Sequence, residues 1–269
     1  MSQLKLKALL VLISLIMGFF LGRYFHSHSA QSFKEFSETD PSSVYTNPLL
    51  TCGDIENLSV GEMERIKKEI TALQSKKENS QVTHLSVYLR DLNNGPWLGL
   101  NEKEDFYPAS LLKVPLMFAA YKADEDQPGF LNRVVKYEAP LFNNYQIFPP
   151  EEEIQPGQSY TLRELMRRSI IYSDNNATAL LALQVGPQYS LKIFSDFGIE
   201  KPISDQDYTM KVRTYASFFR VLYNASYLSK KNSEEALSIL AKVNFPNGIE
   251  AGLPKGTTFS HKFGEREAR

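Results

Sequence analysis

PASLLKVP, residues 108–115, holds the main chemical clue in this sequence. It places Ser110 and Lys113 three residues apart, just before the apolar run Leu116–Ala120. Side chains at this spacing share one face of a helix. A lysine in the opening turn of a buried helix is unfavourable unless it is paired or loses its charge. Either it reaches solvent, or its lowered pKa makes it the base for a serine hydroxyl, which is a weak nucleophile by itself.

The bulk composition excludes several classes of function. The 269 residues are 42% hydrophobic and 23% charged, which suits a globular protein of one large domain or two intimate subdomains. The net charge of −1 gives no sign of a nucleic-acid partner. Only Cys52 and four histidines are present, so a disulfide within the chain is impossible and a metal site is not expected. We expect a monomer without metal or organic cofactor.

The N-terminus reads as a membrane segment. Two lysines precede the uninterrupted apolar run at residues 8–22, which is the layout of a secretory signal or signal anchor. HSHSA, residues 26–30, is a poor cleavage site. We therefore expect residues 1–25 to be an uncleaved anchor that contacts the membrane through residues 8–22, with the rest of the chain outside the cytoplasm. A cleaved signal and a secreted protein are the alternative.

The rest of the chain divides into a tether and a domain. Residues 26–54 are rich in Ser, His and Thr and show no sustained period, so they predict a flexible tether. Residues 55–269 are expected to form the domain. A capping serine and apolar residues at helical spacing predict a surface helix over 59–77. Two alternating apolar runs around a turn signal predict a hairpin over 83–100.

The remainder alternates between long helical patterns and one late strand pattern. Residues 110–243 are mostly helical, with a capping box at Thr161 and Glu164. GTTFSHKFGE, residues 256–265, returns to a strand pattern. Strands far apart in the sequence are therefore expected to share one sheet, with a helical lobe inserted between them.

Two further motifs follow the serine and lysine. YSDN, residues 172–175, falls at a polar break between apolar helices, where Asp and Asn are also ordinary capping residues. HKFG, residues 261–264, puts a second lysine on the late strand, where a solvated lysine is the simpler interpretation. Each motif alone is more often structural. The three in this order, at a helix start, an interhelical turn and a late strand, favour a catalytic site.

Together these motifs resemble the serine β-lactamases of class A and the related penicillin-binding proteins, whose signature is S-x-x-K, S-D-N and K-T-G. The resemblance covers roughly residues 55–265. It implies an α/β fold, an α+β sandwich in which an antiparallel sheet is flanked by helices and carries an inserted all-helical lobe. It also implies a site between sheet and lobe that reacts with a small-molecule β-lactam or a peptidoglycan peptide.

The resemblance implies four catalytic side chains. Ser110 would be the nucleophile that becomes acylated, and Lys113 its base or proton partner. Ser173 would pass a proton to the leaving nitrogen. Lys262 would supply positive charge for the substrate carboxylate and lower the pKa of nearby groups.

The resemblance also implies the binding groups. The Asn175 side chain would hydrogen-bond the acylamide of the substrate, while Asp174 would hold the turn together. Gly264 matches the glycine that follows the lysine of the third motif. The oxyanion hole would consist of the backbone N–H groups of Ser110 and Glu265.

Three features depart from the family pattern. Phe263 stands where the third motif has a hydroxyl residue, so one anchor for a carboxylate is missing. The family's deacylating glutamate has no match, because Glu200, Asp205 and Asp207 lie outside any E-x-x-L-N pattern. The chain ends soon after Gly264, where the family continues with further strands and a helix. We therefore expect a C-terminally truncated domain.

These features leave three hypotheses. The first is an extracytoplasmic serine acyl-hydrolase that opens β-lactams or related amides. The second is a relative of penicillin-binding proteins that acts on D-alanyl peptides and deacylates slowly. The third is a non-catalytic wall-binding or sensing domain. The missing glutamate favours the second or third, whereas the complete set of serine, lysine and asparagine residues argues against the third.

Overall fold

The structure is a computed structural model. It describes residues 44–47, 59–77, 83–92, 95–141, 146–199, 208–246 and 248–265. The expected anchor at residues 8–22 lies outside these ranges and stays a prediction. Within them, no helix combines the length and the apolar character that crossing a membrane requires.

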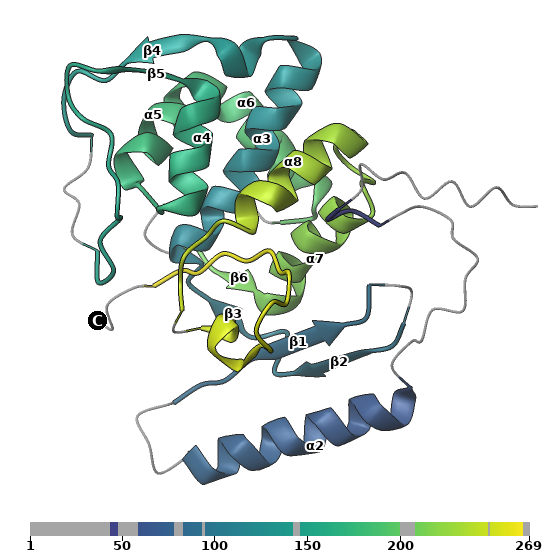
Figure 1. Cartoon of the computed structure of the whole chain (residues 1–269). Coiled ribbons are helices and arrows are strands. Elements are labelled where there is room, and N and C mark those ends of the chain that lie inside the picture. The colour runs from purple at the N-terminus through teal and green to yellow at the C-terminus, as the bar shows by residue number, and fades with distance from the viewer. Residues whose placement is uncertain are drawn as a thin grey trace, which may run out of the picture. The chain divides into compact units, whose positions relative to one another are not determined.

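The first helix and the hairpin form as predicted. Helix α2 (Val60–Lys77) starts with a capping box, because Ser59 Oγ accepts from the Glu62 N–H at 3.2 Å and Glu62 Oε2 accepts from the Ser59 N–H at 2.7 Å. Strands β1 (Val87–Arg90) and β2 (Trp97–Leu100) pair antiparallel. Helix α2 packs on β2 (Figure 1).

The helical patterns of the sequence also appear. From residue 105 the elements are, in order, β3 (Asp105–Phe106), η1 (Ala109–Leu112), α3 (Lys113–Asp126), η2 (Phe130–Asn132), β4 (Val134–Lys136), β5 (Ser159–Thr161), α4 (Leu162–Ile171), α5 (Asn175–Val185), α6 (Pro187–Asp196), β6 (Met210–Lys211), α7 (Val212–Tyr223), α8 (Lys230–Leu240) and η3 (Ile249–Gly252). At the start of α4, Thr161 Oγ1 accepts from the Glu164 N–H at 3.1 Å, which is one of the two hydrogen bonds of the predicted capping box. The Glu164 carboxylate pairs with Arg167 and Arg168.

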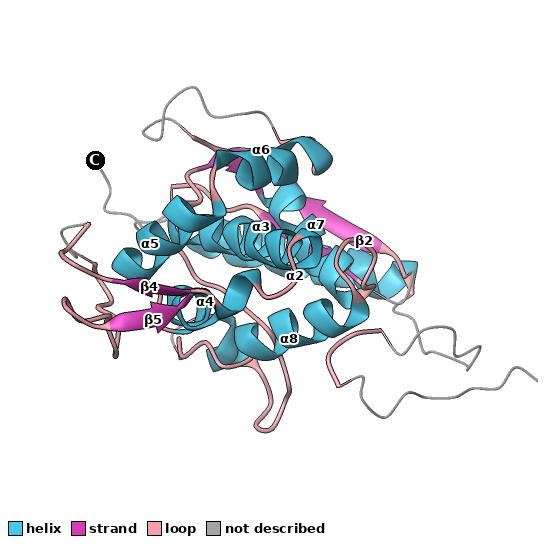
Figure 2. Ribbon diagram, turned by 90° about the horizontal axis from the view of Figure 1, so that it is seen from above, coloured by secondary structure: helices cyan, strands magenta, loops and turns pink. Residues whose placement is uncertain are grey.

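Helix α3 lies at the centre of the hydrophobic core. It contacts α4, α5 and α6, and Figure 2 shows it near the middle of the helices. The Phe118 ring packs edge-on against Phe197 and Phe218, with centroids 5.5 and 5.2 Å apart. Residues 113–121 of α3 are buried, except for the half-buried Leu116. This burial holds the N-terminus of α3, which begins at Lys113, in one position.

Strand pairing agrees in part with the expected sheet. In the described residues the strands form three two-stranded sheets, β1–β2, β3–β6 and β4–β5. The β3–β6 pair joins segments on either side of helices α3 to α6, which is the predicted insertion of a helical lobe. The expected late strand is not found, because residues 258–265 pair with no strand of the described residues. Instead, the His261 N–H donates to Leu240 O at 3.3 Å, so the segment is attached to the end of α8.

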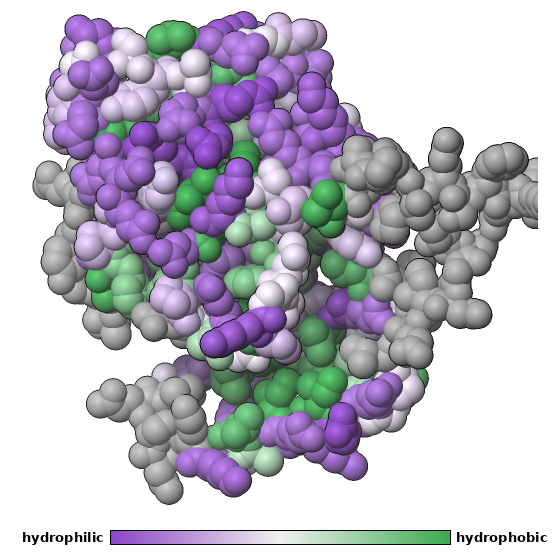
Figure 3. All heavy atoms as spheres, viewed as in Figure 1, coloured by the Kyte–Doolittle hydropathy of each residue, from purple (hydrophilic) through white to green (hydrophobic). Residues whose placement is uncertain are grey.

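Apolar residues are distributed unevenly. Figure 3 shows hydrophilic side chains over most of the helical part at the top of the view, and hydrophobic ones lower down, near α2 and the hairpin. Met63 of α2 and Leu98 of β2 are buried. Leu73, one of the apolar residues at helical spacing in α2, is 59% exposed. The packed face of α2 therefore does not extend to Leu73.

Residues 44–47 fall in the stretch expected to be a tether, and they contact helix α8. The backbone N–H groups of Val44, Tyr45 and Thr46 all donate to the Glu234 carboxylate, at 2.7, 2.8 and 2.8 Å. Burial raises the pKa of Glu234, but the hydrogen bonds from Thr46 and its neighbours outweigh it and lower the net pKa. The charge of Glu234 thus fixes this piece of chain on α8.

Candidate active site

The Ser110 turn is a strained helix entrance. Ser110 lies in the 3₁₀ turn η1, whose Leu111 N–H donates to Pro108 O at 2.9 Å. Ala109 has a φ of 46°, a left-handed conformation that a residue with a Cβ rarely adopts. Such strain persists only where the surroundings hold it, and it is concentrated at functional sites. The turn leaves Ser110 half-buried, one helical turn ahead of Lys113.

The Ser173 turn is the second strained point. It joins α4 to α5, and Ser173 has a φ of 59° and is fully buried. Asp174 caps α5, because its Oδ1 accepts from the N–H groups of Asn176 and Ala177 at 2.8 and 3.0 Å. Its Oδ2 accepts from the Ile154 N–H at 2.8 Å. Asp174 therefore holds the turn and also ties it to the segment before β5.

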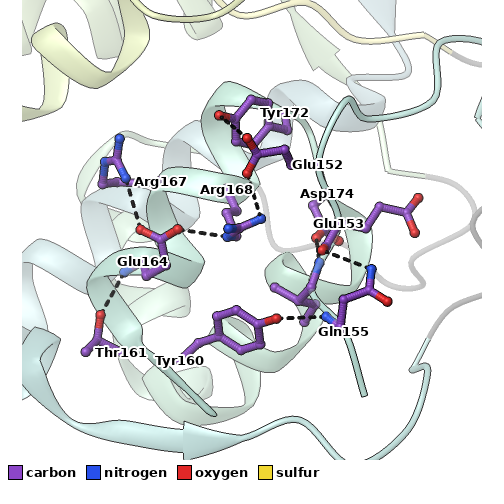
Figure 4. A network of polar contacts seen from close by, with 11 residues as sticks. Glu152, Glu153, Gln155, Tyr160, Thr161, Glu164, Arg167, Arg168, Tyr172 and Asp174 are labelled. Carbon is purple, nitrogen blue, oxygen red and sulfur yellow. Dashed lines mark hydrogen bonds and ion pairs between the residues drawn. The ribbon is translucent and has the colours of Figure 1, made fainter. Parts of the chain in front are cut away.

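A polar network around α4 supports this turn (Figure 4). Arg168 pairs with Glu164 at 2.8 Å and with Glu152 at 3.3 Å, which links the helix to the segment next to Ile154. The Gln155 N–H donates to the Tyr160 hydroxyl at 2.8 Å. Individual ion pairs near the surface contribute little. Their joint effect is to fix residues 152–155 against the Ser173 turn.

Lys113 is buried within the site. It is 4% exposed, and its Nζ donates to Ser173 O at 2.5 Å, Ser173 Oγ at 3.0 Å and Asn175 Oδ1 at 2.8 Å. These three acceptors use all the N–H groups of an ammonium. Burial lowers the pKa of Lys113 to about 7, although the negative charge of Asp174 opposes the shift. Lys113 can therefore gain or lose a proton at neutral pH.

Lys262 reaches the same hydroxyl from another part of the chain. It is 8% exposed, and its Nζ donates to Ser173 Oγ at 3.2 Å and to Phe263 O at 2.8 Å. Burial lowers the pKa of Lys262 to about 7, and the positive charge of Lys113 adds to this, whereas Glu265 opposes it. The structure thus brings Lys113, Ser173, Asn175 and Lys262 together.

Gly264 explains how the third motif meets the Ser110 turn. A Cβ built on Gly264 would lie 2.8 Å from Pro108 O and 3.1 Å from Leu111 N. Those distances leave no room for any side chain, so only glycine permits this approach. The backbone on the two sides of Gly264 therefore runs next to the Ser110 turn, where the predicted oxyanion hole requires it. No hydrogen bond between Ser110 and Lys113 is among the contacts of the described residues.

Residues that the motifs did not point to lie on one side of the site. Gln146 Nε2 donates to Ser173 O at 3.2 Å, and the Phe148 N–H donates to Glu265 Oε1 at 2.9 Å. Phe148 and Phe245 both contact the Phe263 ring. Each of these two residues precedes a proline, which favours extended backbone, but that signal says nothing about a site.

Other expected features are outside the described chain or not found in it. Glu200, Asp205 and Asp207, the acids of the link after α6, lie outside the described residues. Within the described ranges, no group of three His, Cys, Asp or Glu side chains could hold a metal ion.

Comparison with known proteins identifies the family. The model of the beta-lactamase enzyme family named Beta-lactamase2 matches residues 65–268. The chain therefore belongs to this family of β-lactamase-related hydrolases. A comparison with curated proteins finds no match.

Solved structures show the same fold. A mutant of PBP-A, described as an acyl-enzyme complex with penicillin G, is 22% identical, with a TM-score of 0.62 over 76% of this chain and 78% of that one. A class A β-lactamase from Mycobacterium abscessus is 21% identical, with a TM-score of 0.61 over 72% and 78%. A β-lactamase from Xanthomonas campestris is 20% identical, with a TM-score of 0.63 over 74% and 79%. These matches confirm the predicted α/β, β-lactamase-like fold class.

Proposed function

We propose that this protein is a serine acyl-hydrolase that opens β-lactams or related amides through an acyl-enzyme on Ser110. The observation that carries the proposal is the Ser173 hydroxyl between two buried lysines, with Nζ–Oγ distances of 3.0 and 3.2 Å. Two desolvated lysines would destabilise a domain that had no catalytic role, because burying charge is unfavourable. Perturbed pKa values of this kind are typical of catalytic sites.

The acylation step follows from the residue chemistry. Neutral Lys113 accepts the proton of Ser110 while the Ser110 oxygen forms a bond to the amide carbonyl carbon. Negative charge collects on the carbonyl oxygen, where backbone N–H groups of Ser110 and Glu265 stabilise it. The C–N bond then breaks, and Ser173 gives its proton to the nitrogen as Lys113 returns one to Ser173. The net result moves the Ser110 proton to the leaving amine and leaves an ester.

A second candidate is a penicillin-binding-protein-like enzyme that acts on D-alanyl peptides. The link between α6 and β6 carries no E-x-x-L-N motif, so the sequence offers no obvious carboxylate to activate the deacylating water. A positioned general base contributes about 10²–10⁴-fold to such a step. A mutant of PBP-A, which shares the fold, is described as an acyl-enzyme complex with penicillin G. Slow release of the acyl group would favour this candidate.

We also propose that the domain works outside the cytoplasm, attached to the cell membrane through residues 8–22 and acting as a monomer. The support is the sequence alone, with its lysine flank and apolar run. Carbonate extraction of the expressed protein tests it. Retention in the membrane at full mass is expected, whereas release at a reduced mass would mean a cleaved signal.

Two assays on the full-length chain in detergent separate the functional candidates. One is covalent labelling by a fluorescent penicillin, and the other is turnover of a chromogenic cephalosporin. Lasting turnover of a chromogenic cephalosporin supports the hydrolase. A burst of about one equivalent followed by slow release supports the penicillin-binding relative. Absence of any label would contradict both and leave the non-catalytic domain.

A further inference from the structure

Three phenylalanines from distant segments form one aromatic cluster beside Lys262. The rings of Phe245 and Phe263 stack, with centroids 4.2 Å apart and an interplanar angle of 12°. Phe148 meets both rings edge-on, with centroid distances of 5.2 Å to Phe245 and 6.5 Å to Phe263. Phe148 is 39% exposed, so the cluster keeps one apolar side accessible. We call these three residues the phenylalanine cluster.

The cluster changes what Lys262 can bind. An ammonium has three N–H groups. Two of those of Lys262 point to Ser173 Oγ and Phe263 O, and its Nζ lies 4.0 Å from the centroid of the Phe263 ring. That distance is within the range of a cation–π interaction. All three directions of the ammonium are therefore occupied by groups of the protein itself.

Glu265 adds a negative charge on the same side. Its Oε1 accepts from the Phe148 N–H, which ties it to the phenylalanine cluster. Its Oε2 is buried and has no hydrogen-bond partner among the described residues. Lys262 balances part of this charge, and what remains repels other anions in a medium of low dielectric constant.

Building on the proposed function, we propose that the phenylalanine cluster and Glu265 make this site select acyl donors that are uncharged and apolar next to the scissile amide. A substrate carboxylate would find no hydroxyl at position 263 and no free N–H on Lys262, and it would face the charge of Glu265. A neutral group in the same place would instead pack against the exposed edge of Phe148. The bonds made and broken are those of the acylation step above.

Benzylpenicillin and its methyl ester test this selectivity, because esterification removes the charge of one group and adds only a methyl. The acylation rate constant of each is measured by intact-protein mass spectrometry on the full-length chain in detergent. The ratio of the two rates within one preparation does not depend on how much of the protein is folded. The wild-type protein is expected to react with the ester at least as fast as with the acid.

Phe263→Thr supplies the missing hydroxyl and removes the ring from Lys262. It should shift the rate ratio toward the acid by about tenfold or more, the usual effect of a hydrogen bond to a charged group. Glu265→Gln should shift the ratio in the same direction. Phe259→Thr is the matched control, since Phe259 packs on His261 outside the cluster and its loss should leave the ratio unchanged.

Two results would overturn the selectivity while leaving the proposed function intact. One is a wild-type protein that prefers the acid by tenfold or more. The other is a rate ratio that Phe263→Thr does not change. If neither compound acylates the protein, the proposed function fails and the selectivity fails with it.

Discussion

Lys113 and Lys262 approach one hydroxyl, that of Ser173, with Nζ–Oγ distances of 3.0 and 3.2 Å. Two ammonium groups so near each other repel, and both are buried. Burial and repulsion from Lys113 bring the pKa of Lys262 to about 7. Burial lowers the pKa of Lys113 to a similar value, although the charge of Asp174 opposes the shift. Because the two groups are coupled, their protons leave in steps that belong to the pair. Near neutral pH, the pair can therefore supply both a base and an acid.

The first prediction is a pH dependence of acylation. Lys113 accepts a proton only as the neutral amine, so the acylation rate should rise as the pH increases through about 7. Stopped-flow measurement of the labelling rate over about 1.5 pH units on either side of pH 7 checks this. Lys113→Arg keeps the charge but cannot lose a proton, and should slow acylation by about 10²–10⁴-fold. A pH-independent rate, or a fully active Lys113→Arg variant, would rule out this base.

The second prediction concerns stability. In the unfolded chain Lys113 has its ordinary pKa of 10.5, whereas in the folded protein the value is about 7. Between these values the unfolded state binds more protons, so the free energy of unfolding should rise with pH. The rise should be about 1 kcal/mol or more per pH unit steeper in the wild type than in Lys113→Met. Urea denaturation at several pH values measures the free energy of unfolding of both proteins. Equal slopes against pH would contradict a lowered pKa of Lys113.

The third prediction concerns the role of the Asp174 carboxylate in holding the Ser173 turn. Asp174→Ala removes the cap of α5 and the acceptor for the Ile154 N–H. It should lower the free energy of unfolding by about 2–4 kcal/mol, since a helix cap and a buried charged hydrogen bond are lost together. Asp174→Asn keeps one acceptor oxygen and should cost less. Equal effects of the two changes would show that the carboxylate does not organise this turn.

The fourth prediction tests the attachment of residues 44–47. Glu234→Ala removes the acceptor of three backbone N–H groups and should destabilise the protein by about 1–3 kcal/mol. Lys231→Ala, at an exposed position of the same helix, should change stability by less than about 0.5 kcal/mol. If the two variants unfold at the same denaturant concentration, the attachment of residues 44–47 to Glu234 contributes nothing to stability.

Local patterns predicted much of this molecule, and long-range contacts limited the rest. The helix at 59–77, the hairpin and the break at Ser173 depend on neighbouring residues, so the sequence predicts them. The order of the three motifs also predicted that Lys113 and Lys262 come close to Ser173. The partners of Phe263 are separated from one another by about a hundred residues along the chain, and no period encodes their contact. Residues 258–265 likewise have strand composition, yet their partner is the end of α8.

The central claim is that Ser110 is acylated, and the mass of the intact protein after reaction with penicillin G tests it most directly. The full-length wild-type chain is expected to gain the mass of one penicillin, on the peptide that contains Ser110. Ser110→Ala should gain nothing, while its free energy of unfolding stays within about 1 kcal/mol of the wild type. A wild-type chain without an adduct, or an equal adduct on Ser110→Ala, would contradict the account.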